Sequence, residues 1–73
     1  MRLLVTGGAG CLGSEIVNSF SDVASHVVAL DNFSIGDQSW VKDKANISVV
    51  EGDIRDPKVL KEVFSDLEPT HVV

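Results

Sequence analysis

The stretch that decides the fold is Val5-Thr6-Gly7-Gly8-Ala9-Gly10-Cys11-Leu12-Gly13-Ser14. The apolar run Leu3-Leu4-Val5 just before its glycines predicts a buried parallel strand, because such strands read as continuous hydrophobic segments. After the glycines, Ile16, Val17 and Phe20 recur at the spacing of one face of an α-helix. The glycines therefore lie between a strand and a helix.

The positions of the glycines suggest a separate physical role for each. A tight turn needs backbone with φ above zero, and a pyrophosphate can approach the main chain only where no Cβ intervenes; we expect Gly7 and Gly10 to meet these needs. Gly13 lies one helical turn further, where glycine costs about 1 kcal/mol relative to alanine, so we expect it to let the helix pack closely on its strand. Helix-start N–H groups bind an anion without a cationic side chain, and residues 6–19 contain no Lys or Arg. The stretch predicts a dinucleotide-binding turn.

An acidic residue, Asp31, follows the second predicted strand, residues 26–30. A carboxylate about 20 positions after such glycines accepts hydrogen bonds from an adenosine ribose hydroxyl. Because it also repels a 2′-phosphate, NAD is the expected cofactor rather than NADP. The residues alone leave open that the glycines form only a flexible turn and that Asp31 is only a cap. A Walker-type loop is excluded, because Ser14 follows Gly13 where that loop needs Lys-Ser or Lys-Thr.

Strand and helix patterns alternate along the whole chain, which predicts a parallel sheet. The expected strands are residues 2–6, 26–30, 47–50 and one that begins at residue 70; the expected helices are residues 12–20, a short one over 37–43, and 57–67 after an Asp56 cap. Right-handed crossovers give the strand order 3-2-1-4, the first half of a Rossmann-type doubly wound α/β sheet. The glycine turn, Asp31 and Asp53 all follow carboxyl ends of strands, so they should converge on one crevice.

Length and composition narrow the class of protein. With 73 residues, the chain is short for a stable α/β domain, so we expect residues 1–73 to be the N-terminal part of an NAD-binding domain, with the remainder and a substrate domain outside it. The net charge of -5 argues against nucleic-acid binding. No apolar run approaches the roughly 20 residues of a membrane span. A lone cysteine, Cys11, fits a cytoplasmic protein and a small packing role, and His26 and His71 lack metal-ligand spacing.

Three segments, in order along the chain, match one family. Residues 6–14 match a Thr-Gly-x-x-Gly-x-x-Gly turn, residues 30–36 are similar to a loop that holds the adenine ribose, and residues 51–56 are similar to a segment beside the adenine ring. On these motifs the chain resembles the extended short-chain dehydrogenase/reductase family, in particular the nucleotide-sugar epimerases and dehydratases, of which the UDP-glucose 4-epimerases are one group. One departure is Cys11, where these enzymes often carry Phe or Tyr.

The resemblance implies cofactor contacts along all three segments. The backbone N–H groups of the first segment would bind the pyrophosphate; the residues implied there are Gly7, Gly10, Cys11, Leu12 and Gly13. The adenine ribose would be held by Asp31 and Asn32.

Two further pairs complete the implied cofactor site. Ser34 and Gly36 would help to close the ribose loop, although both are also ordinary turn residues. Asp53 would accept a hydrogen bond from the adenine amino group and Ile54 would contact the ring. Without the resemblance, a simple turn role after Gly52 is the better interpretation of Asp53.

The resemblance also implies an activity. In this family a tyrosine acts as general acid/base, with a lysine four residues later and a nearby Ser or Thr, while hydride passes transiently to NAD. The chain contains no tyrosine, so we assign no catalytic residue to it. We expect a nucleotide-sugar substrate to bind to parts of the whole protein outside this chain. We also expect the whole protein to be a homodimer. Two alternatives stay open: a non-catalytic NAD(P)-binding regulatory or redox-sensing module, and a fragment that binds nothing.

Overall fold

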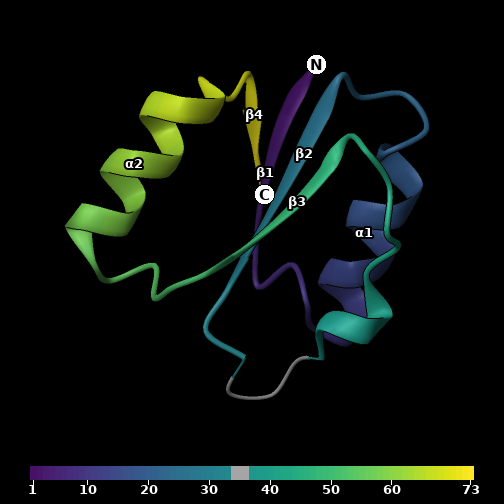
Figure 1. Cartoon of the computed structure of the whole chain (residues 1–73), viewed down its shortest axis with the longest axis horizontal. Helices are drawn as coiled ribbons and strands as arrows, with labels where there is room; N and C mark the ends of the chain where they lie inside the picture. The colour runs from purple at the N-terminus through teal and green to yellow at the C-terminus, as the bar shows by residue number, and fades with distance from the viewer. Residues whose placement is uncertain (34–36) are drawn as a thin grey trace.

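Four parallel strands form a single sheet in a computed structural model that describes residues 1–33 and 37–73. Their order is β3-β2-β1-β4, which confirms the predicted order. The elements are β1 (Arg2–Thr6), α1 (Cys11–Phe20), β2 (His26–Asp31), a 3-10 turn η1 (Gln38–Trp40), β3 (Ile47–Glu51), α2 (Pro57–Leu67) and β4 (His71–Val72). Figure 1 shows the first three strands running away from the N-terminus, so that their carboxyl ends lie at one edge.

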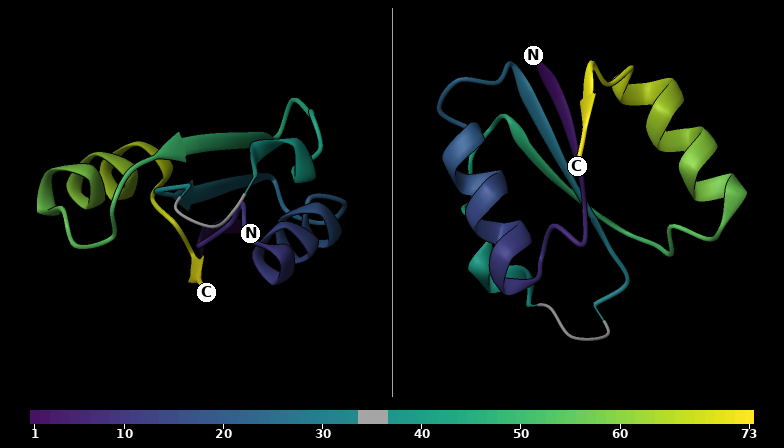
Figure 2. Two further views of the ribbon diagram at one scale, coloured as in Figure 1. Left: turned by 90° about the horizontal axis from the view of Figure 1, so that it is seen from below. Right: turned by 180° about the vertical axis from the view of Figure 1, so that it is seen from behind.

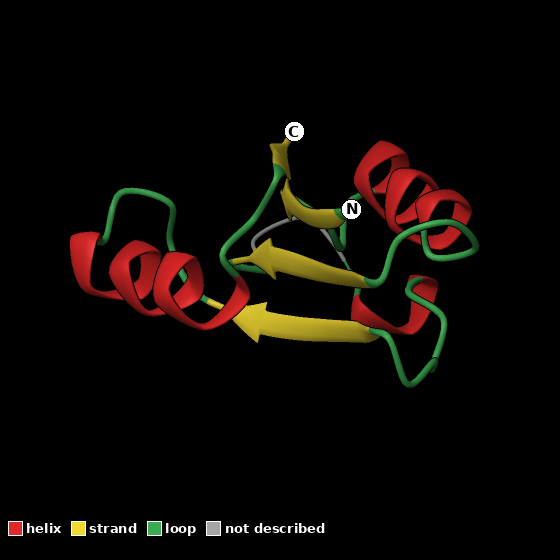
Figure 3. Ribbon diagram, turned by 90° about the horizontal axis from the view of Figure 1, so that it is seen from above, coloured by secondary structure: helices red, strands yellow, loops and turns green. Residues whose placement is uncertain are grey.

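The helices cover opposite faces of this sheet, as Figure 2 and Figure 3 show. Successive strand residues point to opposite faces, so each face carries its own apolar cluster. The buried residues on the α1 side are Leu3, Val5, Val17, Ala24, Val27 and Ala29. Those on the α2 side are Leu4, Val28, Leu30, Val63 and Leu67. The sheet is therefore the middle layer of an α/β/α arrangement.

Helix α2 begins and ends where the sequence predicts. The Asp56 side chain accepts a hydrogen bond from the Lys58 N–H at 3.0 Å, and Pro57 occupies the first helical position. The cap is favourable because it gives a hydrogen-bond partner to an N–H group that has none within the helix. Proline is favourable at the first position because it has no N–H group that would need such a partner. Glu68 ends the helix in the left-handed conformation, with φ 49°.

Other boundaries differ from the predictions. Helix α1 begins at Cys11 rather than residue 12, and β4 begins at His71 rather than residue 70. The expected helix over residues 37–43 is only the single turn η1, because Val41 leaves the helical region with φ -90° and ψ 129°. Strands β2 and β3 are each one residue longer than predicted, since Asp31 pairs with Glu51.

Gly13 packs against the glycine turn rather than against a strand, which corrects the sequence prediction. A Cβ at this position would overlap the Gly7 carbonyl and lie 2.9 Å from its carbon and 3.1 Å from the Gly8 Cα. Backbone atoms at these positions cannot move aside as a flexible side chain could. The absence of a side chain at Gly13 thus allows the first turn of α1 to lie on the segment that precedes it.

We predict that Gly13→Ala destabilises the protein even though alanine gains about 1 kcal/mol in helix propensity. Overpacking against the Gly7 carbonyl should lower the free energy of unfolding by about 1–3 kcal/mol. Chemical denaturation of the protein that contains this segment measures the change. Ser19→Ala, at an exposed position of the same helix, is the control and should have little effect. A Gly13→Ala variant as stable as wild type would show that the packing at this point is looser than described.

Candidate functional site

The glycine turn is bonded to the end of β2 through its own backbone. The Gly7 and Gly8 N–H groups both donate to the Leu30 carbonyl, at 2.8 and 3.3 Å. Gly10 then donates to the Gly7 carbonyl at 3.1 Å, and Gly7 has the positive φ, 67°, that a glycine was expected to supply. The turn is therefore held together by its own hydrogen bond and is bonded to β2.

The start of α1 holds the N–H groups best placed for a phosphate. The Ser14 N–H bonds to the carbonyl of the N-cap, Gly10, at 2.8 Å. The preceding helical residues are Cys11, Leu12 and Gly13, positions whose N–H groups have no acceptor within the helix. Together with the helix dipole they make an end that is suited to an anion. The side chains of Cys11 and Leu12 are exposed, so Cys11 does not have the packing role that the sequence suggested.

The turn amides differ in how they are used. Because Gly7 and Gly10 donate to carbonyls within the protein, their N–H groups are engaged, contrary to the expectation that they act as phosphate donors. Gly10 also lacks the positive φ considered for it: its φ is -72°, which any residue adopts. A Cβ at Gly10 would lie 3.3 Å from the Gly7 carbonyl oxygen. Because Gly10 has no side chain, it leaves open space beside the turn.

Gly8 is a close-packing position of the turn that the sequence did not reveal. A Cβ there would lie only 2.6 Å from the Cβ of Ala29 and 2.8 Å from its Cα. Ala29 is fully buried in β2. The available signal was this alanine among the larger residues Val27, Val28 and Leu30, because a small side chain inside an apolar strand marks a close approach of another segment.

Asp31 faces the glycine turn. It is the last residue of β2, with 9% of its surface exposed. One carboxylate oxygen, Oδ2, accepts a hydrogen bond from the Ala9 N–H at 3.0 Å, and Oδ1 accepts one from the Phe33 N–H at 2.9 Å. Each oxygen retains a second acceptor position. The predicted convergence of turn and acid is therefore present.

Asp37 is also bonded to the same turn. The Asp37 N–H donates to the Ala9 carbonyl at 2.9 Å. Asn32 follows Asp31 directly and is exposed. Ser34 and Gly36 lie outside the described residues.

The third segment, after β3, is also attached to Asp31. The Gly52 N–H donates to the Asp31 carbonyl oxygen at 2.9 Å. Asp53 folds back onto Arg55, accepting from its N–H at 2.8 Å and from its guanidinium nitrogen Nη2 at 2.7 Å. These bonds lower the pKa of Asp53 to about 2. Ile54 is 53% exposed. Asp53 thus has the turn role, and the adenine contacts of both residues stay predictions.

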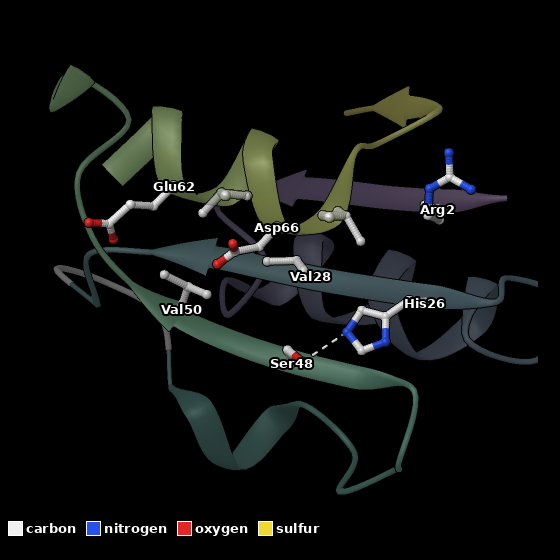
Figure 4. Close-up of a pocket in the computed structure, with 9 residues that line it drawn as sticks. Arg2, His26, Val28, Ser48, Val50, Glu62 and Asp66 are labelled. Atoms are coloured by element: carbon white, nitrogen blue, oxygen red, sulfur yellow. Dashed lines mark hydrogen bonds between the residues drawn. The ribbon is translucent and has the colours of Figure 1, made fainter. Parts of the chain in front are cut away.

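A groove elsewhere on the molecule is separate from this edge. It has a volume of about 480 Å³ and lies between α2 and the sheet, as Figure 4 shows. His26 Nε2 and Ser48 Oγ lie 2.8 Å apart in it. Glu62 and Asp66 of α2 line the groove, and the Asp66 carboxylate lies between α2 and β2. Because Arg2 and His26 begin their strands, the groove extends to the end of the sheet opposite the glycine turn.

Residues 1–33 and 37–73 contain neither a candidate metal site nor a membrane-spanning helix. No cluster of three or more His, Cys, Asp or Glu side chains there is arranged to hold a metal ion. None of the helices formed by these residues has the length and apolar character needed to cross a bilayer.

Comparison with known proteins agrees with the geometry at the carboxyl edge. The sequence profile of the NAD dependent epimerase/dehydratase family matches residues 3–73. The chain belongs to this family. The UDP-glucose 4-epimerase of Corynebacterium glutamicum is 41% identical over 66 residues, which are 90% of this chain and 19% of that protein. The chain thus spans about a fifth of the length of such relatives.

Solved structures of the family share the fold. The Bordetella bronchiseptica enzyme WbmG, in complex with NAD and UDP, matches with a TM-score of 0.91 and 39% identity over 99% of this chain and 23% of its own. The Thermus thermophilus UDP-glucose 4-epimerase complex with NAD matches with a TM-score of 0.85 and 38% identity, over 99% of this chain and 22% of its own. The Rossmann-type fold predicted from the sequence is confirmed.

We predict that Asp53 titrates near pH 2 and that Arg55→Ala moves its pKa up toward the ordinary value of 3.8. The guanidinium stabilises the ionised carboxylate, so its removal should make protonation easier. Because the folded-state pKa is depressed, the contribution to stability is present above about pH 4 and is lost as the pH falls through about 2. NMR titration of the Asp53 carboxyl carbon measures both values. An unchanged midpoint in the variant would mean that Arg55 does not contact Asp53 in solution.

Proposed function

We propose that this chain is the NAD-binding opening segment of a nucleotide-sugar epimerase or dehydratase. The observation that carries the proposal is the Asp31 carboxylate bonded to the Ala9 N–H of the glycine turn, 3.0 Å away. This bond supports a ribose-binding role for Asp31, because it holds the carboxylate next to the turn that leads into the start of α1. The family match over residues 3–73 and neighbours described as complexes with NAD support the same assignment.

The residues present fit the cofactor. Among the described residues, and apart from its chain neighbours, the Gly7 carbonyl oxygen at 3.3 Å is the one atom within 4 Å of a Cβ built at Gly10. A larger side chain at Gly10 would therefore extend into open space beside the turn. The N–H groups of Cys11 and Leu12 would bind the pyrophosphate, because a helix N-terminus neutralises an anion with backbone dipoles. The second acceptor positions of Asp31 would receive the ribose hydroxyls, with Asn32 beside them. A 2′-phosphate would meet this carboxylate, so NAD is favoured over NADP.

The adenine end of the site is assigned to residues after β2 and β3. Ser34 and Gly36 would close the ribose loop. Asp53 would accept from the adenine amino group in place of part of its pairing with Arg55, which gives each carboxylate oxygen two hydrogen bonds. The exposed Ile54 side chain would cover one face of the ring.

When bound, NAD supplies a reversible hydride acceptor; the role of this chain is to hold and orient it. We assign the general acid/base and the sugar-nucleotide contacts to parts of the protein beyond residue 73. A structure of Thermotoga maritima UDP-glucose 4-epimerase with UDP-glucose supports a nucleotide sugar as substrate. We further propose a homodimer in the cytoplasm, on family membership alone. No observation favours a purely regulatory module.

We predict that Asp31→Ala weakens NAD binding by roughly tenfold or more, the effect of losing a hydrogen bond to a charged acceptor. It should also narrow the preference for NAD over NADP, because the repulsion of the 2′-phosphate is removed together with the ribose contact. Isothermal titration of the whole protein with both cofactors measures the two effects. Unchanged discrimination in the variant would refute the ribose role of Asp31, and an absence of saturable NAD binding by wild type would refute the proposed function.

We predict that Gly10→Val abolishes dinucleotide binding by the whole protein while the sheet still forms. The branched side chain would occupy space beside the turn that a cofactor needs. Circular dichroism reports the fold and equilibrium titration with NAD reports binding. Ser19→Val, at an exposed position toward the other end of α1, is the matched control and should bind NAD normally. Wild-type affinity in Gly10→Val would place the pyrophosphate elsewhere.

A further inference from the structure

We propose that Asp31 is a positioning residue for the pyrophosphate turn as well as the ribose acceptor, so that the ribose and phosphate halves of the site are energetically coupled through the Ala9 peptide. This inference rests on the proposed function. It adds that the carboxylate has a structural role before any cofactor arrives.

The Ala9 peptide is held on both of its sides. Its N–H donates to Asp31 Oδ2 at 3.0 Å, and its carbonyl accepts from the Asp37 N–H at 2.9 Å. Ala9 itself is fully buried. One bond comes from the last residue of β2 and the other from the N-cap residue of η1. The turn is thus bonded to residues on both sides of the loop expected to surround the ribose.

Of the two hydrogen bonds of the Ala9 peptide, the one to Asp31 is the stronger type. A carboxylate that accepts from a backbone N–H makes a charge-assisted hydrogen bond, about twice as strong as one between neutral groups. With 9% of its surface exposed, Asp31 is shielded from most competing water. Its other oxygen is fixed by the Phe33 N–H at 2.9 Å, so the carboxylate is oriented from two directions.

The position of Ala9 sets the position of the helix start. Gly10 is the next residue and the N-cap of α1, so a displaced Ala9 peptide displaces the N–H groups at the helix start. A ribose that bonds to Asp31 restrains the same carboxylate that restrains Ala9. By reciprocity, a phosphate bound at the helix start must favour ribose binding by the same factor.

Amide hydrogen exchange and binding of inorganic pyrophosphate test this inference in the whole protein. Without cofactor, Asp31→Ala should speed exchange of the Ala9 amide by roughly tenfold or more, and it should weaken binding of inorganic pyrophosphate, which has no ribose to contact residue 31. Asp43→Ala is the matched control: it removes a carboxylate at an exposed position after η1, one that has no role in holding Ala9 or the cofactor. Its Ala9 exchange and pyrophosphate affinity should equal those of wild type.

Asp31→Asn provides a second variant of nearly identical shape, should the alanine variant fold poorly. One of its two side-chain atoms cannot accept a hydrogen bond, so either Ala9 or Phe33 should lose protection. If Asp31 variants lose NAD affinity but keep wild-type Ala9 exchange and pyrophosphate binding, the coupling is refuted and the ribose role stands. If wild type binds neither NAD nor pyrophosphate, the proposed function fails, whatever the exchange of Ala9 shows.

Discussion

The parallel register between β1 and β2 is the constraint on which the whole carboxyl edge depends. It pairs Thr6 with Leu30, so Gly7 and Asp31 leave the two strands at the same level. The Leu30 carbonyl can then accept from Gly7 and Gly8, and the Asp31 side chain can reach Ala9. A slip by one residue would turn Asp31 to the other face of the sheet. The register is fixed because both faces are buried and each side needs its own apolar residues.

Small residues let backbone approach backbone where the turn, the strand and the helix meet. Gly8 lies against Ala29, and Gly13 lies against the Gly7 carbonyl. Side chains at these points would separate the layers and move the helix N-terminus away from β2. The close packing that stabilises the turn is therefore the same packing that sets the position of the helix end proposed to bind the pyrophosphate. A substitution at Gly8 or Gly13 should therefore change both the stability of the fold and the position of the α1 N-terminus.

The acidic residues at this edge have partners within the protein before they have any ligand. Asp31 accepts from two backbone N–H groups, and Asp53 accepts from Arg55. The Asp31 carboxylate has more acceptor positions than its two bonds use, so a structural role and a ligand role can coexist at that residue. Such preorganisation lowers the entropic cost of ordering the site when a ligand binds.

The sequence by itself determined the element order, the α/β/α class, the strand order and the identity of the turn, because apolar periodicity and glycine spacing are local properties of the chain. It also located Asp31 and the Asp56 cap of α2. Only the tertiary structure decided that the N–H groups of Gly7 and Gly10 donate to carbonyls within the protein. It also decided that Gly13 packs against the turn and that Gly8 must be small because it lies against Ala29. Residues 38–40 form a single turn rather than a longer helix. These outcomes depend on which segments meet across the sheet, and a contact between residues distant in sequence leaves no periodic signal in either segment.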